Sequence, residues 1–371
     1  MHGISAASSG ESQTGSPPSI AARTRLTVAD DSKNLSRGAT RTRTNLMSDA
    51  RKAIPRNAAR RLPIVAGPTA AGKSALSLML AEQIGGTVIN ADAMQCYADW
   101  RIITARPKPA EETRAPHRLY GVRTLTEKVD AAWWSQAAKV ELYACQNPIL
   151  CGGSGMYLKS LVDGLAPIPD PGEPARAEAR AMLSVHGAAW LHAWLTTHDP
   201  GTSAKLKPTD SQRLVRAAEV LIGTGQGLAF WQAQPATPLT GFEPVLILLE
   251  PPRDELRIAI KNRFKTMLQD GALDEVRAVA SRNLDRRLPG LRAHGVPELF
   301  EYLEGKITLE EAVQRAVTAT VGYTRRQTTW FRHQKLADQR LTLTICARIG
   351  DDIEYSESIR DKTISFINSE Y

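Results

Sequence analysis

Gly67-Pro68-Thr69-Ala70-Ala71-Gly72-Lys73-Ser74 is the most informative stretch of this 371-residue chain. It follows Leu62-Pro63-Ile64-Val65-Ala66, an apolar run typical of a buried parallel strand, and it precedes apolar residues at helical spacing. The pattern G-x-x-x-x-G-K-[ST] is that of a phosphate-binding loop, in which backbone amides and a helix N-terminus surround phosphate oxygens. The sequence therefore predicts a polyphosphate site, with Lys73 on the terminal phosphates and Ser74 as a ligand of Mg²⁺.

More strands alternate with helices farther along the chain. The runs at residues 87–90, 148–151 and 244–249 each predict a buried strand. This alternation predicts an α/β fold, a P-loop NTPase-like parallel sheet flanked by helices. From about residue 166 proline-rich and then short helical stretches predict an all-helical insertion. Everything beyond Asp254 has the pattern of a long amphipathic helix up to about Lys335, so the C-terminal part is also expected to be helical.

These changes of texture divide the chain into four parts. We expect a catalytic core in residues 61–165 and 240–336, a helical insertion in residues 166–239, and a C-terminal tail in residues 337–371 for which the pattern predicts no element. Residues 1–60 are rich in Ser, Thr, Ala and Arg and lack apolar periodicity. Three interpretations of them stay open: a disordered basic extension, an organellar transit peptide, or a mis-assigned start, which we favour because Met47 opens a plausible N-terminus.

The net charge of +8 is unevenly distributed. Residues 1–60 hold ten of the 47 basic and four of the 39 acidic residues, which leaves 37 against 35 in the remainder. Affinity of the folded part for nucleic acid must therefore come from local basic patches. No apolar run approaches the roughly 20 residues that cross a bilayer, and the four cysteines form no C-x-x-C pair, so we expect a soluble cytoplasmic protein with reduced thiols.

Asp92 is a second candidate functional residue. It follows the strand at residues 87–90, and carboxylates at the carboxyl end of a parallel strand face the crevice in which ligands bind. A helix N-cap or a solvated turn would also explain it.

Two basic stretches could bind RNA. In residues 210–219 helical geometry places Gln212, Arg216 and Glu219 on one face, although intrahelical Arg–Glu pairs on a surface helix would explain the same pattern. Residues 323–332 interleave basic and aromatic side chains, which suits backbone charge and base stacking or, alternatively, a helix whose aromatic rings fill the core. Between these stretches and the first strand, the Gly-rich turn at residues 152–155 predicts a close approach of backbones.

Taken together, these stretches resemble the tRNA dimethylallyltransferases, also called isopentenyl-diphosphate:tRNA transferases, in their bacterial form. The resemblance is collinear over about residues 62–335. Its blocks lie at residues 67–74, 90–95, 104–107, 116–117, 152–157, 210–216 and 326–332. A helix after the last predicted strand adds Arg253, Leu256, Ile260, Arg263, Met267, Gly271, Glu275 and Val276.

The resemblance implies roles for residues that match the family's motifs. The diphosphate of dimethylallyl diphosphate would be held by Gly67, Pro68, Thr69, Ala70, Ala71, Gly72, Lys73 and Ser74. The catalytic set would be Asp92 as general base, Lys73 and Thr104. The tRNA contacts would come from Asp92, Ala93, Met94, Gln95, Thr104, Gln212, Arg213, Leu214, Val215 and Arg216.

The implied reaction is transfer of the dimethylallyl group to the exocyclic amine of the adenosine immediately 3′ of the anticodon. The substrates would be tRNAs that read codons beginning with U, bound through the anticodon stem-loop, with release of diphosphate. We expect a cytoplasmic monomer that needs Mg²⁺ and no membrane. Either Arg213 or Arg216 would help Lys73 to neutralise the diphosphate. A prenyltransferase acting on free adenine nucleotides and a P-loop kinase that binds ATP stay open as alternatives.

Three residues depart from the family's pattern. Ala93 stands where a Ser usually follows the catalytic Asp, so the hydrogen bond of that hydroxyl is missing. Arg106 replaces a common Lys and keeps its charge. Val321 stands where an Arg often precedes the last block, which removes one basic group.

Overall fold

The structure, a computed structural model, describes residues 59–350 and 353–369. The predicted extension at residues 1–60 therefore lies almost entirely outside the described residues. The described chain enters its first strand, β1 (Arg60–Ala66), two residues before the apolar run that predicted it. Arg60 extends the strand because its guanidinium donates to the carbonyl of Cys145 and lies over the ring of Phe242.

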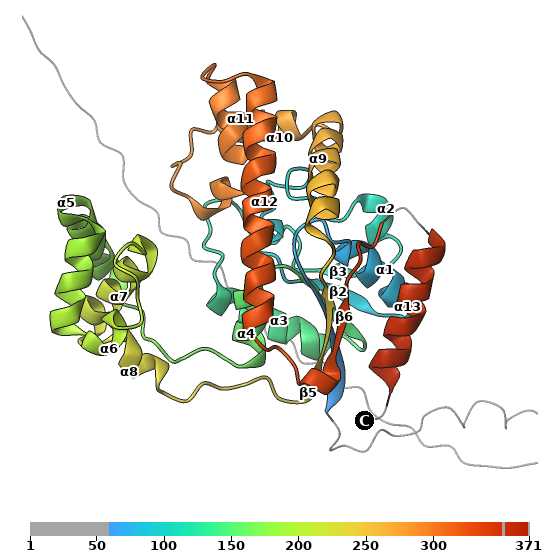
Figure 1. The fold of residues 1–371 in the computed structure, drawn as a ribbon, viewed down its shortest axis with the longest axis horizontal. Helices are drawn as coiled ribbons and strands as arrows, with labels where there is room; N and C mark the ends of the chain where they lie inside the picture. Colours follow the sequence, from blue (N-terminus) through green and yellow to red (C-terminus); the bar gives the residue numbers. More distant parts are fainter. Residues whose placement is uncertain (1–58, 351–352, 370–371) are drawn as a thin grey trace, which may run out of the picture. The chain divides into compact units, whose positions relative to one another are not determined.

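In this part of the chain six parallel strands form one sheet (Figure 1). Their order is β3-β2-β4-β1-β5-β6. The bounds are β2 (Thr87–Asn90), β3 (His117–Arg118), β4 (Pro148–Gly152), β5 (Phe242–Leu249) and β6 (Thr342–Ile345). The central strand β1 is flanked by β4 and β5, and its residues from Leu62 onward are buried. The predicted parallel α/β sheet is confirmed, and its apolar central strands are those expected of a sheet covered on both faces.

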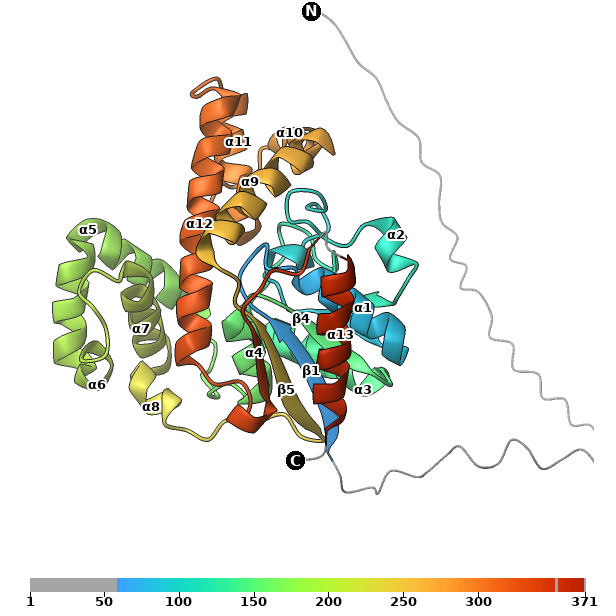
Figure 2. The same cartoon turned by 45° about the vertical axis from the view of Figure 1, so that its right-hand side comes forward.

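Helices cover the two faces of this sheet. Because strand–helix–strand crossovers are right-handed, α1 (Lys73–Ile84) lies on one face, and α3 (Ala131–Ala144) and α4 (Gly155–Val162) lie on the other. The C-terminal helix α13 (Ile353–Asn368) packs against α1 (Figure 2). Smaller elements are α2 (Pro109–Glu112) and the 3₁₀ turns η1 (Met94–Cys96), η2 (Pro289–Arg292) and η3 (Gln339–Leu341). Residues 337–371, for which the pattern predicts no element, thus contribute β6 to the sheet and α13 to its cover.

The prediction of one long helix beyond Asp254 is wrong, because the helical region is divided into four helices. The chain forms α9 (Arg253–Gln269), α10 (Ala272–Ala280), α11 (Val296–Leu303) and α12 (Leu309–His333) instead. Gly271, Gly295 and Gly305 lie in the three breaks between them with φ values of 103°, 95° and 71°, a left-handed conformation that glycine adopts without strain. The longest of the four, α12, begins with a capping box between Thr308 and Glu311 and packs against α9 and α11.

The helical character predicted for residues 166–239 is confirmed. They form α5 (Gly172–His198), α6 (Pro200–Ser203), α7 (Ser211–Thr224) and α8 (Leu228–Gln232). A hydrophobic cluster distinct from the main core holds these helices together, through Ala179, Leu191, Leu195, Leu214, Ala217 and Ala218. Within α5 a helix break falls at Gly187, whose φ is 80°.

The glycine turn after β4 brings three segments into contact, as its sequence predicts. A Cβ at Gly152 would lie 2.1 Å from the carbonyl oxygen of Ala91, and one at Gly155 would lie 2.2 Å from the ring of Trp330. Side chains at either position are therefore excluded by the loop after β2 and by α12. The same contact explains why Trp330 is half-buried. The edge of its ring that faces Gly155 packs against the glycine turn and is not available to stack on a base.

We predict that Gly155→Ala lowers the thermal stability of the protein, because the added methyl group overlaps the indole of Trp330. Overpacking of this kind costs about 1–3 kcal/mol. Thermal unfolding of Gly155→Ala, alone and combined with Trp330→Leu, measures the effect, and the second substitution should restore part of the loss. Gly322→Ala, in the middle of α12, is the matched control and should not destabilise, because the added Cβ would meet only the side chain of Arg326, at 3.9 Å. Equal melting temperatures for Gly155→Ala and the wild type would contradict the packing described.

Candidate active site

A cavity of about 350 Å³ opens beyond the carboxyl ends of β1, β2 and β4, where ligands of open α/β sheets bind. The volume suits a small molecule. From the strand ends come Thr69, Lys73, Ser74, Asp92, Ala93, Met94, Gln95, Ile103, Thr104, Cys151, Gly152 and Ser154. From the helical side come Ile260, Arg263, Phe264, Met267, Arg292, Ala293, His294, Thr320, Tyr323 and Arg326.

The phosphate loop has the geometry that its sequence predicts. Gly67 has a φ of 143° and lies so close to Leu249 that a Cβ would come within 2.3 Å of that residue's carbonyl oxygen. Ala70 and Gly72 both have left-handed backbones, with φ values of 67° and 94°. Because Gly72 caps α1 without a side chain, the amides of the first helical turn can bind an anion.

Gln327 of α12 fixes this loop to the glycine turn. Its Oε1 accepts from the backbone N–H of Thr69 at 2.9 Å, and its Nε2 donates to the carbonyl of Gly153 at 2.9 Å. The side chain is only 4% exposed, so it has few other hydrogen-bond partners. A single buried amide therefore aligns the loops after β1 and β4.

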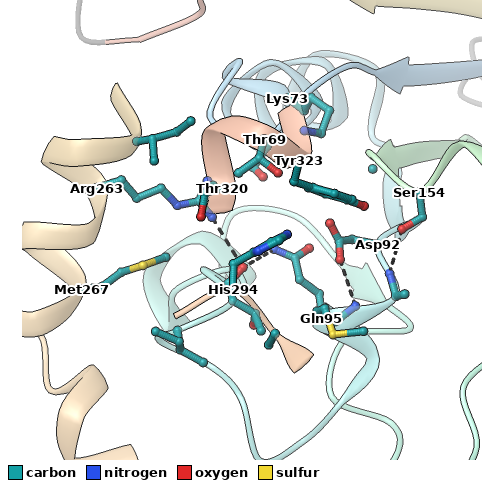
Figure 3. Close-up of a pocket in the computed structure, with 18 of the residues that line it drawn as sticks. Thr69, Lys73, Asp92, Gln95, Ser154, Arg263, Met267, His294, Thr320 and Tyr323 are labelled. Atoms are coloured by element: carbon teal, nitrogen blue, oxygen red, sulfur yellow. Dashed lines mark hydrogen bonds between the residues drawn. The ribbon is translucent and has the colours of Figure 1, made fainter. Parts of the chain in front are cut away.

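Lys73 faces the cavity from the first turn of α1 (Figure 3). Its ammonium donates to the carbonyl of Pro68 at 2.8 Å, within the same loop. Burial lowers the pKa of Lys73 to about 8, and the nearby Cys151 and Asp92 partly oppose this effect. Burying the ammonium without an anion is unfavourable, which is the electrostatic signature of a site built for a negatively charged ligand.

Asp92 faces the same cavity and is held by its neighbours. The side chain of Asn90, fully buried at the end of β2, accepts from the backbone N–H of Asp92 at 2.8 Å and donates to its carbonyl at 2.9 Å. One carboxylate oxygen accepts from the N–H of Met94 at 2.9 Å. This bond is the turn interaction that the sequence left open, and it leaves the other carboxylate oxygen for a ligand. The N–H of Ala93 donates to Ser154 Oγ at 3.1 Å, which ties this loop to the glycine turn.

Gln95 and Thr104 meet at the floor of the cavity. The amide of Gln95 donates to the carbonyls of Thr104 and Ala105, both at 2.9 Å, and so holds that loop in place. The hydroxyl of Thr104 donates to the backbone carbonyl of Trp100 at 2.8 Å. Its oxygen can therefore still accept a hydrogen bond from another group. Of the predicted site residues, Asp92, Ala93, Met94, Gln95 and Thr104 thus come together with Thr69, Lys73 and Ser74 around one cavity.

The five predicted residues of α7 do not line this cavity. Arg213 forms an ion pair with Asp210 and Arg216 forms one with Glu219, at 3.1 and 3.3 Å, while Leu214 is fully buried in the helical cluster. Gln212 is exposed and Val215 is half-buried. The expectation that Arg213 or Arg216 reaches the diphosphate is therefore wrong for this structure, because both lie on a helix that packs in the insertion's own cluster.

Arg263 is the cation that the sequence argument did not assign. It lies on α9 among Ile260, Phe264 and Met267, and its guanidinium is 3.5 Å from the carbonyl of Thr104 (Figure 3). Burial lowers the pKa of Arg263, and the carboxylate of Asp92 opposes that effect. Its signal in the sequence was an arginine within an otherwise apolar stripe at helical spacing, which indicates a charge that faces a site.

Aromatic rings form the remaining wall. His294 and Tyr323 lie with ring centroids 4.7 Å apart, and Figure 3 shows both beside Asp92. Burial raises the pKa of Tyr323 to about 12, whereas burial and the charge of Arg326 lower the pKa of His294. Near neutral pH both rings are therefore uncharged. Tyr323 and Arg326 belong to the basic and aromatic stretch noted in the sequence, and His294 had no such signal.

This arrangement agrees with the comparison to known proteins. The family described as IPP transferase matches residues 95–334. A tRNA dimethylallyltransferase of Acidiphilium cryptum is 63% identical over 322 residues, 87% of this chain and 99% of the relative. The chain belongs to the tRNA dimethylallyltransferase family. A second member, from Granulibacter bethesdensis, is 50% identical over 84% of this chain and 98% of its own length.

Solved structures of tRNA prenyltransferases share the fold. The tRNA isopentenylpyrophosphate transferase of Bacillus halodurans is 27% identical, with a TM-score of 0.58 over 83% of this chain and 97% of that one. A eukaryotic dimethylallyltransferase, described as acting on tRNA, has a TM-score of 0.70 at 24% identity, over 84% of this chain and 80% of the other. The predicted family and the predicted P-loop fold are both confirmed, and the enzyme class is that of a prenyl transferase.

We predict that diphosphate affinity falls as the pH rises through about 8, because the anion prefers the charged form of Lys73. Below that pH the free protein already carries the charge; above it a proton must be taken up on binding, which costs up to tenfold in affinity per pH unit. Calorimetric titration of the wild type and of Lys73→Met across this range measures the effect. The protonation of diphosphate itself affects both affinities equally, so it cancels in their ratio. A ratio that does not change with pH would contradict the prediction.

Proposed function

We propose that the cavity transfers the dimethylallyl group of dimethylallyl diphosphate to the exocyclic amine of the adenosine immediately 3′ of the anticodon. The observation that carries this proposal is that Lys73 and Asp92 line one cavity, an anion-binding loop on one side and a free carboxylate oxygen on the other. A kinase would use the same loop for ATP, but membership of a prenyl transferase family favours an allylic diphosphate.

The phosphate loop and two cations would bind the leaving group. The amides of the first turn of α1, together with Lys73 and Arg263, would surround the diphosphate. Neutralising that charge favours ionisation of the allylic C–O bond, because the electron pair of the bond departs with the diphosphate. These residues act before the acceptor amine bonds to the allylic carbon.

Mg²⁺ fits this site through Ser74, whose hydroxyl lines the cavity next to Lys73. Within the described ranges no three His, Cys, Asp or Glu side chains cluster as metal ligands. That agrees with the habit of Mg²⁺, which is commonly held by few protein oxygens together with substrate phosphates. When bound, the ion would add positive charge beside the departing diphosphate.

Asp92 would act as general base. An adenine amine is a weak nucleophile because its lone pair is delocalised into the ring, so orienting it by a hydrogen bond to a carboxylate assists its attack. As the new C–N bond forms, the amine proton passes to Asp92. Its bond from the N–H of Met94 holds the carboxylate in position throughout.

The walls of the cavity would protect the allylic cation from water. Ile260, Phe264 and Met267 on α9 and the uncharged Tyr323 on α12 supply apolar and aromatic surface next to the cations. Excluding water strengthens the electrostatic contacts and prevents hydrolysis of a reactive intermediate. The aromatic faces add favourable contact with a delocalised positive charge.

The RNA would be bound by two helical regions. We assign residues 61–165 and 240–336 to the catalytic core, residues 337–371 to a tail that completes its sheet, and residues 166–239 to an insertion that contacts the anticodon stem-loop. Gln212, Arg213 and Arg216 on α7 present polar groups at the insertion's surface, whereas Arg325 on α12 lines a second cavity with Arg253 and Arg257. The target adenine must leave its stack to enter the cavity.

The cellular setting follows from the substrate. None of the helices in the described ranges has both the length and the apolar character needed to cross a bilayer. Because tRNA is the acceptor, we propose that the enzyme works in the cytoplasm, as a monomer, on tRNAs that read codons beginning with U.

We predict that Asp92→Asn lowers kcat by about 10²–10⁴-fold, the usual contribution of a general base. The amide can still accept from Met94, so the fold and the KM for dimethylallyl diphosphate should change little. Asp163→Asn, an exposed carboxylate at the end of α4 that pairs with Lys159, is the matched control and should retain full activity. Turnover of Asp92→Asn close to that of the wild type, in assays that vary each substrate, would remove Asp92 from the role of base.

A further inference from the structure

The segment after β6 lies directly on the phosphate loop. Ile349 donates its backbone N–H to the carbonyl of Ala71 at 3.1 Å, and Arg348 donates Nε–H to the carbonyl of Ala70 at 3.2 Å. The segment is fixed at both ends. On one side β6 pairs with β5, and on the other α13 packs against α1, with Ile349 and Ile359 buried. Two consecutive carbonyls of the loop are thus bonded by two consecutive residues of the C-terminal segment.

The fit between the two segments is tight. A Cβ added at Gly72 would lie 2.1 Å from the carbonyl oxygen of Ile349 and 2.6 Å from its Cβ. The second glycine of the loop therefore serves two purposes. It allows the left-handed backbone that begins α1, and it makes room for the C-terminal segment.

Arg348 bonds the loop at its strained position. Ala70 has a φ of 67°, a conformation that costs a non-glycine residue energy and persists only where neighbours hold it. The bonds to the carbonyls of Ala70 and Ala71 hold the outer side of the loop. Because the carbonyl of Ala71 and the N–H of Gly72 belong to one planar peptide and point to opposite sides, holding that carbonyl outward directs the N–H of Gly72 inward, as an anion-binding nest requires.

The charge of Arg348 also acts at the active site. The pKa of Arg263 is lowered first by burial, and the positive charge of Arg348 lowers it further against the opposing effect of Asp92. Arg348 is therefore close enough for its charge to be felt inside the cavity, although it does not line the cavity wall. Arg263 is thus repelled by Arg348 and itself repels Lys73, and a bound diphosphate would relieve that repulsion.

We propose that Arg348 is a positioning residue of the diphosphate site, which holds the phosphate loop in its anion-binding form and adds positive charge behind it. The inference rests on the proposed diphosphate role of the loop. It extends the diphosphate site to the C-terminal segment, whose sequence pattern predicts neither a site residue nor an element.

The test compares Arg348→Gln, Arg348→Ala and Arg348→Lys with the wild type and with Arg340→Ala. Arg340 is the matched control, since it is an exposed arginine of η3 that pairs with Asp338. Calorimetry measures the affinity for inorganic diphosphate, steady-state kinetics give separate KM values for dimethylallyl diphosphate and tRNA, and hydrogen exchange reports the amides of residues 69–72. Melting temperatures show whether each variant is folded.

Arg348→Gln should weaken diphosphate binding and raise the KM for dimethylallyl diphosphate, each by about tenfold. This is the usual contribution of one charge-assisted hydrogen bond to an affinity. The KM for tRNA should stay unchanged, the loop amides should exchange faster, and Arg348→Lys should lie between Gln and wild type. Wild-type diphosphate affinity in both Arg348→Gln and Arg348→Ala, with Lys73→Met impaired, would overturn the inference. So would equal losses for both substrates in variants with lowered melting temperatures. Failure of the wild type itself to bind diphosphate would instead overturn the proposed function.

Discussion

The buried amide of Gln327 is the interaction on which the site depends. It bonds the N–H of Thr69 on one side and the carbonyl of Gly153 on the other, and so fixes the loops after β1 and β4 to each other and to α12. A shorter or apolar side chain would leave the buried carbonyl of Gly153 unpaired, at a cost of about 1–3 kcal/mol, and would release the half-buried N–H of Thr69. The same helix carries Tyr323 and Arg326 to the cavity, so one contact aligns the phosphate loop with the aromatic wall.

The second constraint is electrostatic. Lys73 and Arg263 are both half-buried, and burial lowers the pKa of each. Asp92 offsets part of the repulsion, yet its own position across the cavity is set by Asn90 and Met94 rather than by an ion pair. The carboxylate therefore stays available for an incoming amine, while the cations remain for the leaving group. This arrangement suits a reaction in which the diphosphate leaves toward Lys73 and Arg263 while the amine proton passes to Asp92.

Sequence alone was enough for the parts of the fold that depend on local pattern. The phosphate loop, the strands β1, β2, β4 and β5, and the helical insertion follow from motif, apolar runs and turn residues, and Asp92 follows from its place at a strand end. β3 and β6 were not predicted because the first is a polar pair, His117–Arg118, and the second a four-residue strand with only two apolar side chains, which carry too little pattern. Their pairing is decided by tertiary contact with β2 and β5.

The missed site residues share one cause. Arg263, His294 and Arg348 lie 190 or more positions from Lys73 in the sequence, and only the fold brings them to the phosphate loop and its cavity. Conversely, Arg213 and Arg216 look suitable for phosphate in the sequence, but their helix packs in another hydrophobic cluster. Local chemistry identifies which residues could act, whereas long-range packing decides which of them face the substrate.

In the proposed reaction this cavity transfers the allylic group of a diphosphate to an adenine within tRNA. The most direct measurement incubates the wild-type enzyme with labelled dimethylallyl diphosphate, Mg²⁺, and either an unmodified tRNA that reads codons beginning with U or free adenine nucleotides. Nucleoside mass spectrometry then locates the label. We expect one dimethylallyl group on the exocyclic amine of the adenosine 3′ of the anticodon, and none on the free nucleotides. Label on free nucleotides in preference to tRNA, or no label in the RNA, would contradict it.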